Sequence, residues 1–212
     1  MTVEERLEEY VLAHSDVESD YLRALYRRVN VRLLAPRMAV GHVEGRLLKM
    51  LTQMIRPKNV LEIGTFSGYS ALCIAEGLES GALLYTYEID DELEPFTRPV
   101  IEQSGLAERI RFIIGDALKL VPQTNMLFDM VYIDGDKREY LDYYEMSLER
   151  VPSGGFIIAD NTLWGKQVII PPKRRDARTD GIVAFNDFVA QDARVEKLLL
   201  PLRDGITLIR KK

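Results

Sequence analysis

The chain alternates over most of its length between short apolar runs and longer amphipathic stretches. Strands are predicted for the apolar runs at 59–63, 83–88, 110–114, 128–134 and 155–160. Helical periodicity marks the stretches between them, near 68–78, 91–103, 116–121 and 138–150. Strands joined by helix-length connections form right-handed βαβ units, so this pattern predicts a parallel sheet with helices on both faces.

The two ends of the chain depart from that alternation. Residues 1–30 predict two helices with Ser15-Asp16 as the cap between them, and a third helix follows with an apolar face of Val43, Leu47, Leu51 and Met54. After a helix near 180–192, strands at 195–200 and 206–210 flank the turn Arg203-Asp204-Gly205, which indicates a hairpin with an antiparallel strand at the sheet edge.

We therefore expect one α/β domain over residues 1–212, with N-terminal helices over 1–56 and a Rossmann-like core over 57–212. The core would be a doubly wound sheet of about seven strands, mostly parallel, with an antiparallel C-terminal hairpin strand.

Composition narrows the class of protein. The chain is 47% hydrophobic and 29% charged, as in ordinary globular proteins, and its net charge of −5 argues weakly against general nucleic-acid binding. A single cysteine, Cys73, excludes an intramolecular disulfide framework and predicts a buried, inert thiol in a reducing compartment. The acidic N-terminus lacks a secretory pattern and no apolar run approaches the roughly eighteen residues of a membrane span. We expect a cytoplasmic protein with no membrane association.

The segment from Val60 to Ser70 combines a strand, a glycine turn and a helix start, which predicts a site for a nucleotide-like ligand. Gly64 and Gly68 are four residues apart, unlike the G-x-G-x-x-G of dinucleotide dehydrogenases. The charge of Glu62 disfavours a pyrophosphate and favours a cationic sulfonium with an α-amino group. Glu88, at the end of the next strand, can accept hydrogen bonds from both ribose hydroxyls. The alternative is a tight strand–helix turn with a solvated acid.

Acidic and amide side chains also end the fourth and fifth predicted strands. Parallel strands present their carboxyl ends at one edge, so Asp134, Asp160 and Asn161 should meet in the crevice beside Gly64 and Glu88. Their oxygens suit Mg²⁺, with Mn²⁺ or Ca²⁺ as alternatives, and the two histidines offer no zinc site. Lys137 would project toward such a metal and could take a proton from a substrate hydroxyl. Turns and helix caps are the alternative explanation of these residues.

Several of these motifs occur together in one family. In order, they are Glu62-Ile-Gly-Thr-Phe-Ser-Gly-Tyr-Ser70, Tyr-Glu88-Ile-Asp, Gly115-Asp-Ala117, Ile133-Asp-Gly-Asp-Lys137 and Ala159-Asp-Asn161. In combination they resemble the cation-dependent class I O-methyltransferases, which include catechol and caffeoyl-CoA O-methyltransferases. The likeness runs from about Leu34 to the C-terminus, and Asp-Gly-Asp-Lys is closer to the caffeoyl-CoA branch and its bacterial relatives.

The resemblance implies a role for each matching residue. S-adenosylmethionine (SAM) would contact Glu62, Gly64, Thr65 and Ser70 with its methionine part, Glu88 with its ribose, and Asp116-Ala117 with its adenine. Met38 and Val40 would lie over the cofactor near the transferred methyl group. Asp134, Asp160 and Asn161 would bind the metal, with Asp134 also near the cofactor's amino group, and Lys137 would be the catalytic base.

The implied function is methyl transfer from SAM to a vicinal-dihydroxy aromatic small molecule. Substrate specificity is expected to depend on residues 165–179, which match the family in placement but not in sequence. Lys173, Arg174, Arg175 and Arg178 could pair with a substrate phosphate or carboxylate, or could belong to a solvated loop. Trp164 could form one side of a site for an aromatic substrate, or it could pack under this loop.

Other functions stay open at this point. Some bacterial relatives methylate a hydroxylated uridine in tRNA, which the basic loop favours and the net charge disfavours. A nicotinamide-dependent oxidoreductase or a non-catalytic binding protein would belong to another class. The N-terminal helices could cover the site or form a homodimer, as in the caffeoyl-CoA branch.

Overall fold

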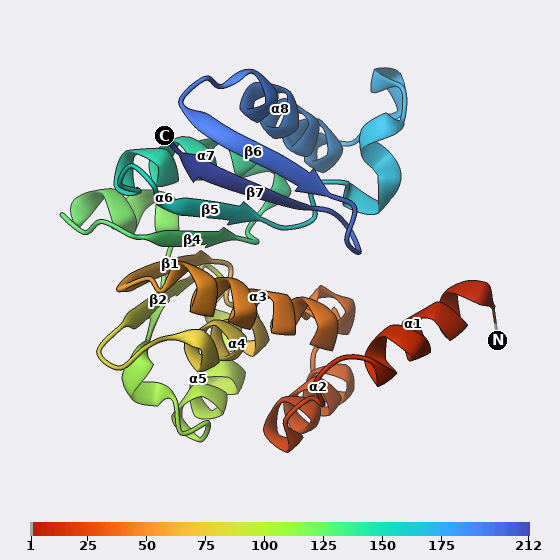
Figure 1. Cartoon of the computed structure of the whole chain (residues 1–212), viewed down its shortest axis with the longest axis vertical. Coiled ribbons are helices and arrows are strands. Elements are labelled where there is room, and N and C mark those ends of the chain that lie inside the picture. Colours follow the sequence, from red (N-terminus) through yellow and green to blue (C-terminus); the bar gives the residue numbers. More distant parts are fainter. Residues whose placement is uncertain (1) are drawn as a thin grey trace.

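A computed structural model describes residues 2–212 and contains, within them, one seven-stranded mixed sheet (Figure 1). The strand order is β3-β2-β1-β4-β5-β7-β6. The strands are β1 (Asn59–Ile63), β2 (Leu83–Glu88), β3 (Ile110–Ile114), β4 (Met130–Ile133), β5 (Phe156–Ala159), β6 (Val195–Leu200) and β7 (Ile206–Lys211). β1 to β5 pair in parallel, whereas β7 is antiparallel to both β5 and β6. The predicted fold class is confirmed.

The position of the antiparallel strand corrects one expectation. β7 lies inside the sheet, between β5 and β6, and β6 forms the edge. Burial explains the order, because β7 buries Ile206 and Ile209 while β6 leaves Leu198 and Leu199 exposed. A strand with apolar side chains on both faces is more stable when it is covered and paired on both sides.

Helices cover both faces of the sheet (Figure 1). The helices are α1 (Val3–Ala13), α2 (Asp20–Arg32), α3 (His42–Ile55), α4 (Tyr69–Gly77), α5 (Glu94–Glu102), α6 (Ala117–Leu120), α7 (Tyr140–Arg150) and α8 (Ala177–Gln191). Short 3₁₀ turns are η1 (Pro36–Met38), η2 (Asp91–Leu93), η3 (Ala107–Arg109), η4 (Val121–Gln123), η5 (Lys137–Glu139), η6 (Trp164–Ile169) and η7 (Pro172–Arg174).

Successive residues of each central strand feed two separate cores. Val60 packs with residues of α2 to α5 in one cluster, and Leu61 packs with residues of α6 to α8 in the other. Alternation of side chains across a strand produces this division, and it accounts for the nearly continuous apolar runs in the sequence.

The N-terminal helices differ in detail from the predictions. Ser19 caps α2, since its hydroxyl accepts a hydrogen bond from the Leu22 amide, so the predicted cap at Ser15-Asp16 was wrong. α1 points away from the sheet (Figure 1). Its apolar side chains Leu7 and Tyr10 are exposed.

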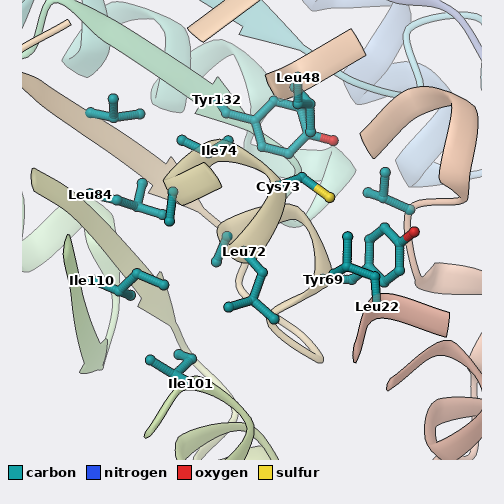
Figure 2. Packing of buried hydrophobic residues seen from close by; sticks show 14 of the residues in the cluster. Leu22, Leu48, Tyr69, Leu72, Cys73, Ile74, Leu84, Ile101, Ile110 and Tyr132 are labelled. Carbon is teal, nitrogen blue, oxygen red and sulfur yellow. The ribbon is translucent and has the colours of Figure 1, made fainter. Parts of the chain in front are cut away.

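The buried face of α3 is rotated from the predicted one. Met54, expected on the apolar face, is 75% exposed, while Glu44, Gly45, Leu48 and Thr52 are buried. A Cβ at Gly45 would lie 2.7 Å from the Cys73 sulfur, so the glycine allows α3 and α4 to approach closely. Figure 2 shows Cys73 within this core, where burial raises its thiol pKa to about 12, as expected for an inert cysteine.

The strand order reverses between β1 and β4, because the chain passes from β1 to β2 and β3 on one side and then to β4 on the other. In open α/β sheets, ligands bind outside the carboxyl ends of the strands at such a switch point. The predicted site residues lie at or just after the carboxyl ends of β1 to β5: the glycine turn, Glu88, Asp116, Asp134 and Asp160. Among the helices within residues 2–212, none has both the length and the apolar character needed to cross a bilayer.

Candidate active site

The turn after β1 has a backbone conformation that its glycines make possible. Gly64 and Gly68 have φ angles of 97° and 81°, in the region that favours glycine. A Cβ at Gly64 would overlap the carbonyl oxygen of Asp134, so only glycine lets the ends of β1 and β4 come this close. Phe66, at φ 45°, is held by its amide, which donates to Glu88 Oε2 at 2.8 Å, and by its carbonyl, which accepts from the Thr97 hydroxyl at 2.5 Å.

Two acids lie beneath and beside this turn. Glu62 is fully buried and neither carboxylate oxygen has a hydrogen-bond partner within 2–212, which raises its pKa to about 8, mainly through desolvation. The nearby hydroxyls of Ser70 and Thr86 lower this pKa, but the Thr86 hydroxyl is engaged by that of Thr65, with 2.5 Å between the two oxygens. A buried, unpartnered carboxylate fits a cationic ligand group.

Glu88 is also buried but is fixed by backbone donors. Its two oxygens accept hydrogen bonds from the amides of Phe66 and Asp90, at 2.8 and 2.9 Å. Each carboxylate oxygen has a further lone pair, so Glu88 can still accept two hydroxyl donors.

Of the remaining predicted cofactor residues, Asp116 and Ala117 follow β3, and Met38 and Val40 lie between α2 and α3. Asp116 caps α6 by accepting a hydrogen bond from the Leu118 amide at 2.9 Å, and Ala117 is buried behind it. Val40 is buried next to the turn η1, whereas Met38 is 58% exposed.

The acidic residues after β4 and β5 form a pair that is largely shielded from solvent, since Asp160 is 4% exposed and the side chain of Asp134 is 17% exposed. Burial raises the pKa of Asp134 to about 6, an effect that the charge of Lys137 opposes and that of Asp160 increases. Burial and the neighbouring acid Glu44 raise the pKa of Asp160 to about 8. Asp160 Oδ1 accepts from the Asn161 amide at 2.6 Å, and Oδ2 accepts from the Tyr132 hydroxyl at 3.2 Å. Asn161 has a φ of 54°, a conformation that asparagine tolerates better than most residues.

Metal binding is supported by the chemistry of these donors only. Within residues 2–212, no three His, Cys, Asp or Glu side chains are grouped as a metal site. The predicted set contains two carboxylates and one amide, which are hard oxygen donors of the kind that Mg²⁺ prefers. Two adjacent, largely shielded acids with raised pKa values also favour a nearby cation, so the residues fit the predicted metal.

Lys137 lies between the two strand ends. Its Nζ donates to Asp134 Oδ1 at 2.7 Å and to the Tyr140 hydroxyl at 2.6 Å, and the residue is 7% exposed. It stands 6.0 Å from the centre of the Trp164 ring. The structure therefore brings Asp134, Lys137, Asp160 and Trp164 to one place.

The basic loop is less closely tied to this place. Lys173 and Arg174, in η7, are exposed, as is Arg178. Arg175 instead holds the loop together, because its guanidinium donates to the carbonyls of Ile170 and Val168 at 2.7 and 3.1 Å. The indole N–H of Trp164 is buried without a partner in the described part of the chain.

Sequence reasoning missed several residues that line the acidic pair. Glu44, on α3, is buried beside Asp160 and accepts from Arg203 Nη1 at 3.0 Å. The proximity of these two acids raises the pKa of Asp160 further. A charged residue on the apolar side of a predicted helix was the available signal for Glu44. Tyr140 follows Lys137 by three residues, a spacing that puts two side chains on one helical face.

A doubly wound sheet with this turn and these strand-end acids defines a Rossmann-like protein that binds a nucleoside-containing ligand without a dinucleotide fingerprint. The chain belongs to the O-methyltransferase family, whose sequence profile matches residues 12–212.

Individual relatives agree with this assignment. The chain is 38% identical over 184 residues to caffeoyl-CoA O-methyltransferase 1 of Eucalyptus globulus, with 82% of this chain and 75% of the relative covered. Caffeoyl-CoA O-methyltransferase 1 of Nicotiana tabacum is also 38% identical, over 185 residues, with coverage of 82% and 77%.

Solved structures match nearly the whole chain. The O-methyltransferase TomG from Streptomyces achromogenes, solved with SAM, superposes with a TM-score of 0.92 at 25% identity and full coverage of both chains. An O-methyltransferase from Bacillus cereus, solved with S-adenosylhomocysteine (SAH), gives 0.91 at 29% identity, covering 98% and 97%. The protein is a SAM-dependent O-methyltransferase of the caffeoyl-CoA O-methyltransferase type, which confirms the resemblance and sets the oxidoreductase alternative aside.

Proposed function

We propose that this enzyme methylates one hydroxyl of a vicinal-dihydroxy aromatic small molecule, with a divalent metal bound beside the methyl donor. The observation that carries the proposal is the group of Asp134, Lys137 and Asp160 at the switch point, next to the glycine turn, in which Lys137 and Asp160 are buried and Asp134 is partly buried. The relatives named above act on caffeoyl-CoA, as their names state, which supports a phenolic acceptor for this chain.

The donor side of the proposed site consists of residues after β1, β2 and β3. Glu62, Gly64, Thr65 and Ser70 would hold the methionine part of SAM, and the unpartnered carboxylate of Glu62 suits its cationic end. Glu88 would accept from the ribose hydroxyls, and Asp116 and Ala117 would border the adenine. Val40 and Met38 would cover the methyl-bearing end from η1.

The acceptor side consists of residues after β4 and β5. Asp134, Asp160 and Asn161 would hold the metal, preferably Mg²⁺ with Mn²⁺ or Ca²⁺ as alternatives, which when bound acidifies a nearby hydroxyl. Lys137 would take the proton of that hydroxyl at its Nζ. Asp134 would orient Lys137 through the 2.7 Å hydrogen bond, and the side chains of Lys137 and Asp134 are only 9% and 17% exposed, which limits the access of water to the proton transfer.

The test is a methyl-transfer assay with SAM and a panel of catechol-type acceptors, with and without Mg²⁺ after removal of metals by chelation. We expect chelation to abolish most turnover, and Lys137→Ala and Asp160→Ala each to lower kcat at least about a hundredfold while SAM affinity changes little. Arg138→Ala, which removes an exposed neighbour paired with Asp136, is the matched control. Full activity in Lys137→Ala, or after chelation, would refute the mechanism.

One alternative acceptor has a specific observation in its favour. Lys173, Arg174 and Arg178 are exposed on the loop after Trp164 and could contact a phosphate backbone, as in the methylation of 5-hydroxyuridine in tRNA. The net charge of −5 favours the small molecule. Adding bulk tRNA to the assay separates the two acceptors. We further propose a single domain over 1–212, a cytoplasmic location and a homodimer, the last to be measured by light scattering.

A further inference from the structure

The hydroxyl of Tyr140 connects the proposed base to the metal-binding strand end. It lies 2.6 Å from Lys137 Nζ and 3.0 Å from the backbone carbonyl oxygen of Asp160. The Ile133 carbonyl is farther away, at 3.4 Å. Carbonyl oxygens only accept, so the phenol hydrogen points to the Asp160 carbonyl and the phenol oxygen accepts from Lys137.

This arrangement fixes the direction of the Lys137 amine. An amine that is ready to accept a proton has two N–H donors and one lone pair. Asp134 Oδ1 and Tyr140 Oη are the two acceptors, at 2.7 and 2.6 Å, and they take both N–H groups. The lone pair is left with the one remaining tetrahedral direction, away from both acceptors. Without Tyr140, the amine could rotate about its last bond.

We propose that Tyr140 is a positioning residue that aims the Lys137 lone pair at the methyl acceptor. Its hydroxyl also links the Lys137 amine to the backbone carbonyl of Asp160. This inference rests on the proposed role of Lys137 as the base. Tyr140 is well placed for the task because it is completely buried and its ring packs edge-on against Phe185 of α8, with 5.7 Å between centroids.

The chain contains a matched control for the loss of this hydroxyl. Tyr144, one turn further along α7, is equally buried and packs edge-on against the same Phe185, with 5.8 Å between centroids. Its hydroxyl donates to Asp192 at 2.8 Å instead of contacting the base. Tyr140→Phe and Tyr144→Phe therefore remove the same atom from the same helix with different partners.

The experiment measures kcat, KM and SAM affinity with catechol and Mg²⁺, or with the best acceptor from the panel, for Tyr140→Phe, Tyr144→Phe and each change combined with Lys137→Ala. We expect Tyr140→Phe to lower kcat by about tenfold to a hundredfold, as for the loss of a hydrogen bond to a group that becomes charged when it takes up the proton, with SAM affinity within about twofold. Tyr144→Phe should keep kcat within about threefold of the wild type. In the Lys137→Ala background, Tyr140→Phe should cause no further loss.

Two results would overturn the inference: an unchanged kcat in Tyr140→Phe, or an equal loss with and without Lys137, which would show a structural role only. If Lys137→Ala is itself fully active, the proposed base fails instead, so the two failures are distinguishable. Should Tyr140→Phe fold poorly, 3-fluorotyrosine at position 140 keeps the shape with a weaker acceptor, and a smaller drop in kcat is expected. No drop there would also reject the inference.

Discussion

Gly181 offers a way to move the proposed base without touching its side chain. This glycine lies within α8, where a Cβ would overlap the carbonyl oxygen of Lys137 and stand 2.8 Å from the Arg138 Cα. Both are backbone atoms and cannot swing aside as a side chain would. In Gly181→Ala, the turn η5 that carries Lys137 must therefore shift away from α8 by about 1 Å to restore ordinary contact.

The magnitudes separate an effect on activity from an effect on stability. A misplacement of about 1 Å at a reacting group can lower the rate about a hundredfold. Overpacking costs about 1–3 kcal/mol of folding free energy, and alanine in a helix returns about 1 kcal/mol relative to glycine. We expect kcat to fall roughly a hundredfold while the free energy of unfolding falls by no more than about 2 kcal/mol.

Gly77 provides the control, because a Cβ there would lie 2.6 Å from the carbonyl oxygen of Lys49. The clash is of the same kind, between a helical glycine and a backbone carbonyl, but at the end of α4 that is remote from the carboxyl ends of the strands. Both variants would be compared by steady-state methyl transfer and by urea unfolding. The reasoning is refuted if Gly181→Ala and Gly77→Ala lose similar activity, or if Gly181→Ala keeps kcat within about threefold of the wild type.

Two further predictions concern charges at the site and its rim. The pKa of Glu62 is raised in the folded state to about 8, so the native protein binds the extra proton and its stability should fall as pH rises from about 4.5 to about 8, by about 1.4 kcal/mol per pH unit. Glu62→Gln should remove this slope in urea unfolding without SAM and should weaken SAM binding in equilibrium dialysis; parallel stability curves would contradict it. Lys173→Glu combined with Arg174→Glu should raise KM for caffeoyl-CoA more than for neutral catechol, because only the former carries phosphates. Lys58→Glu with Lys212→Glu, at the opposite edge of the sheet, is the control, and equal effects of both pairs would reject a substrate contact.

Secondary-structure elements that depend only on neighbouring residues were predicted correctly from the sequence. The strands at 59–63, 83–88 and 110–114 are observed at those bounds, because each is a short apolar run closed by a polar or glycine residue. The strand expected at 128–134 is shorter, Met130–Ile133, although the Asp134 amide still donates to Ile63 across the sheet at 2.9 Å. Strand-end acids such as Asp134 and Asp160 were placed correctly because parallel topology alone brings strand ends together.

Residues whose role depends on tertiary packing could not be predicted from the sequence pattern. α3 was predicted to bury its large apolar residues, but Gly45 and Thr52 face α4 because small side chains permit close helix packing. Glu44 consequently lies on the buried face, where Arg203 reaches it from a turn 159 residues away in sequence. No local spacing encodes such a contact. The contact of Tyr140 with Lys137 could have been predicted from their spacing of three residues. The contact of Tyr140 with the Asp160 carbonyl could not.

The inner position of β7 has a consequence for the acceptor side of the site. Ala159 of β5 pairs with Thr207 of β7, so the hairpin turn before β7 lies directly beyond the end of β5. There the Asp204 carbonyl accepts from the Leu163 amide at 2.7 Å, and its carboxylate accepts from the Gly165 amide at 2.9 Å. Gly205 fits only without a side chain, because a Cβ would stand 2.6 Å from the Leu163 nitrogen.

The hairpin therefore braces the loop that carries Asn161 and Trp164. Had β7 formed the sheet edge beyond β6, its turn would lie about 5 Å further from β5, one strand spacing away, and could not make these bonds. The chain instead passes first along the edge strand β6 and then back along β7, which pairs with β5. The same return lets Arg203 donate to Glu44 at 3.0 Å, and Glu44 lies beside Asp160, so this turn also holds an acid that borders the proposed metal site. The antiparallel insertion thus braces the proposed acceptor side of the site, whereas the proposed donor side is built from residues after β1, β2 and β3 and near η1.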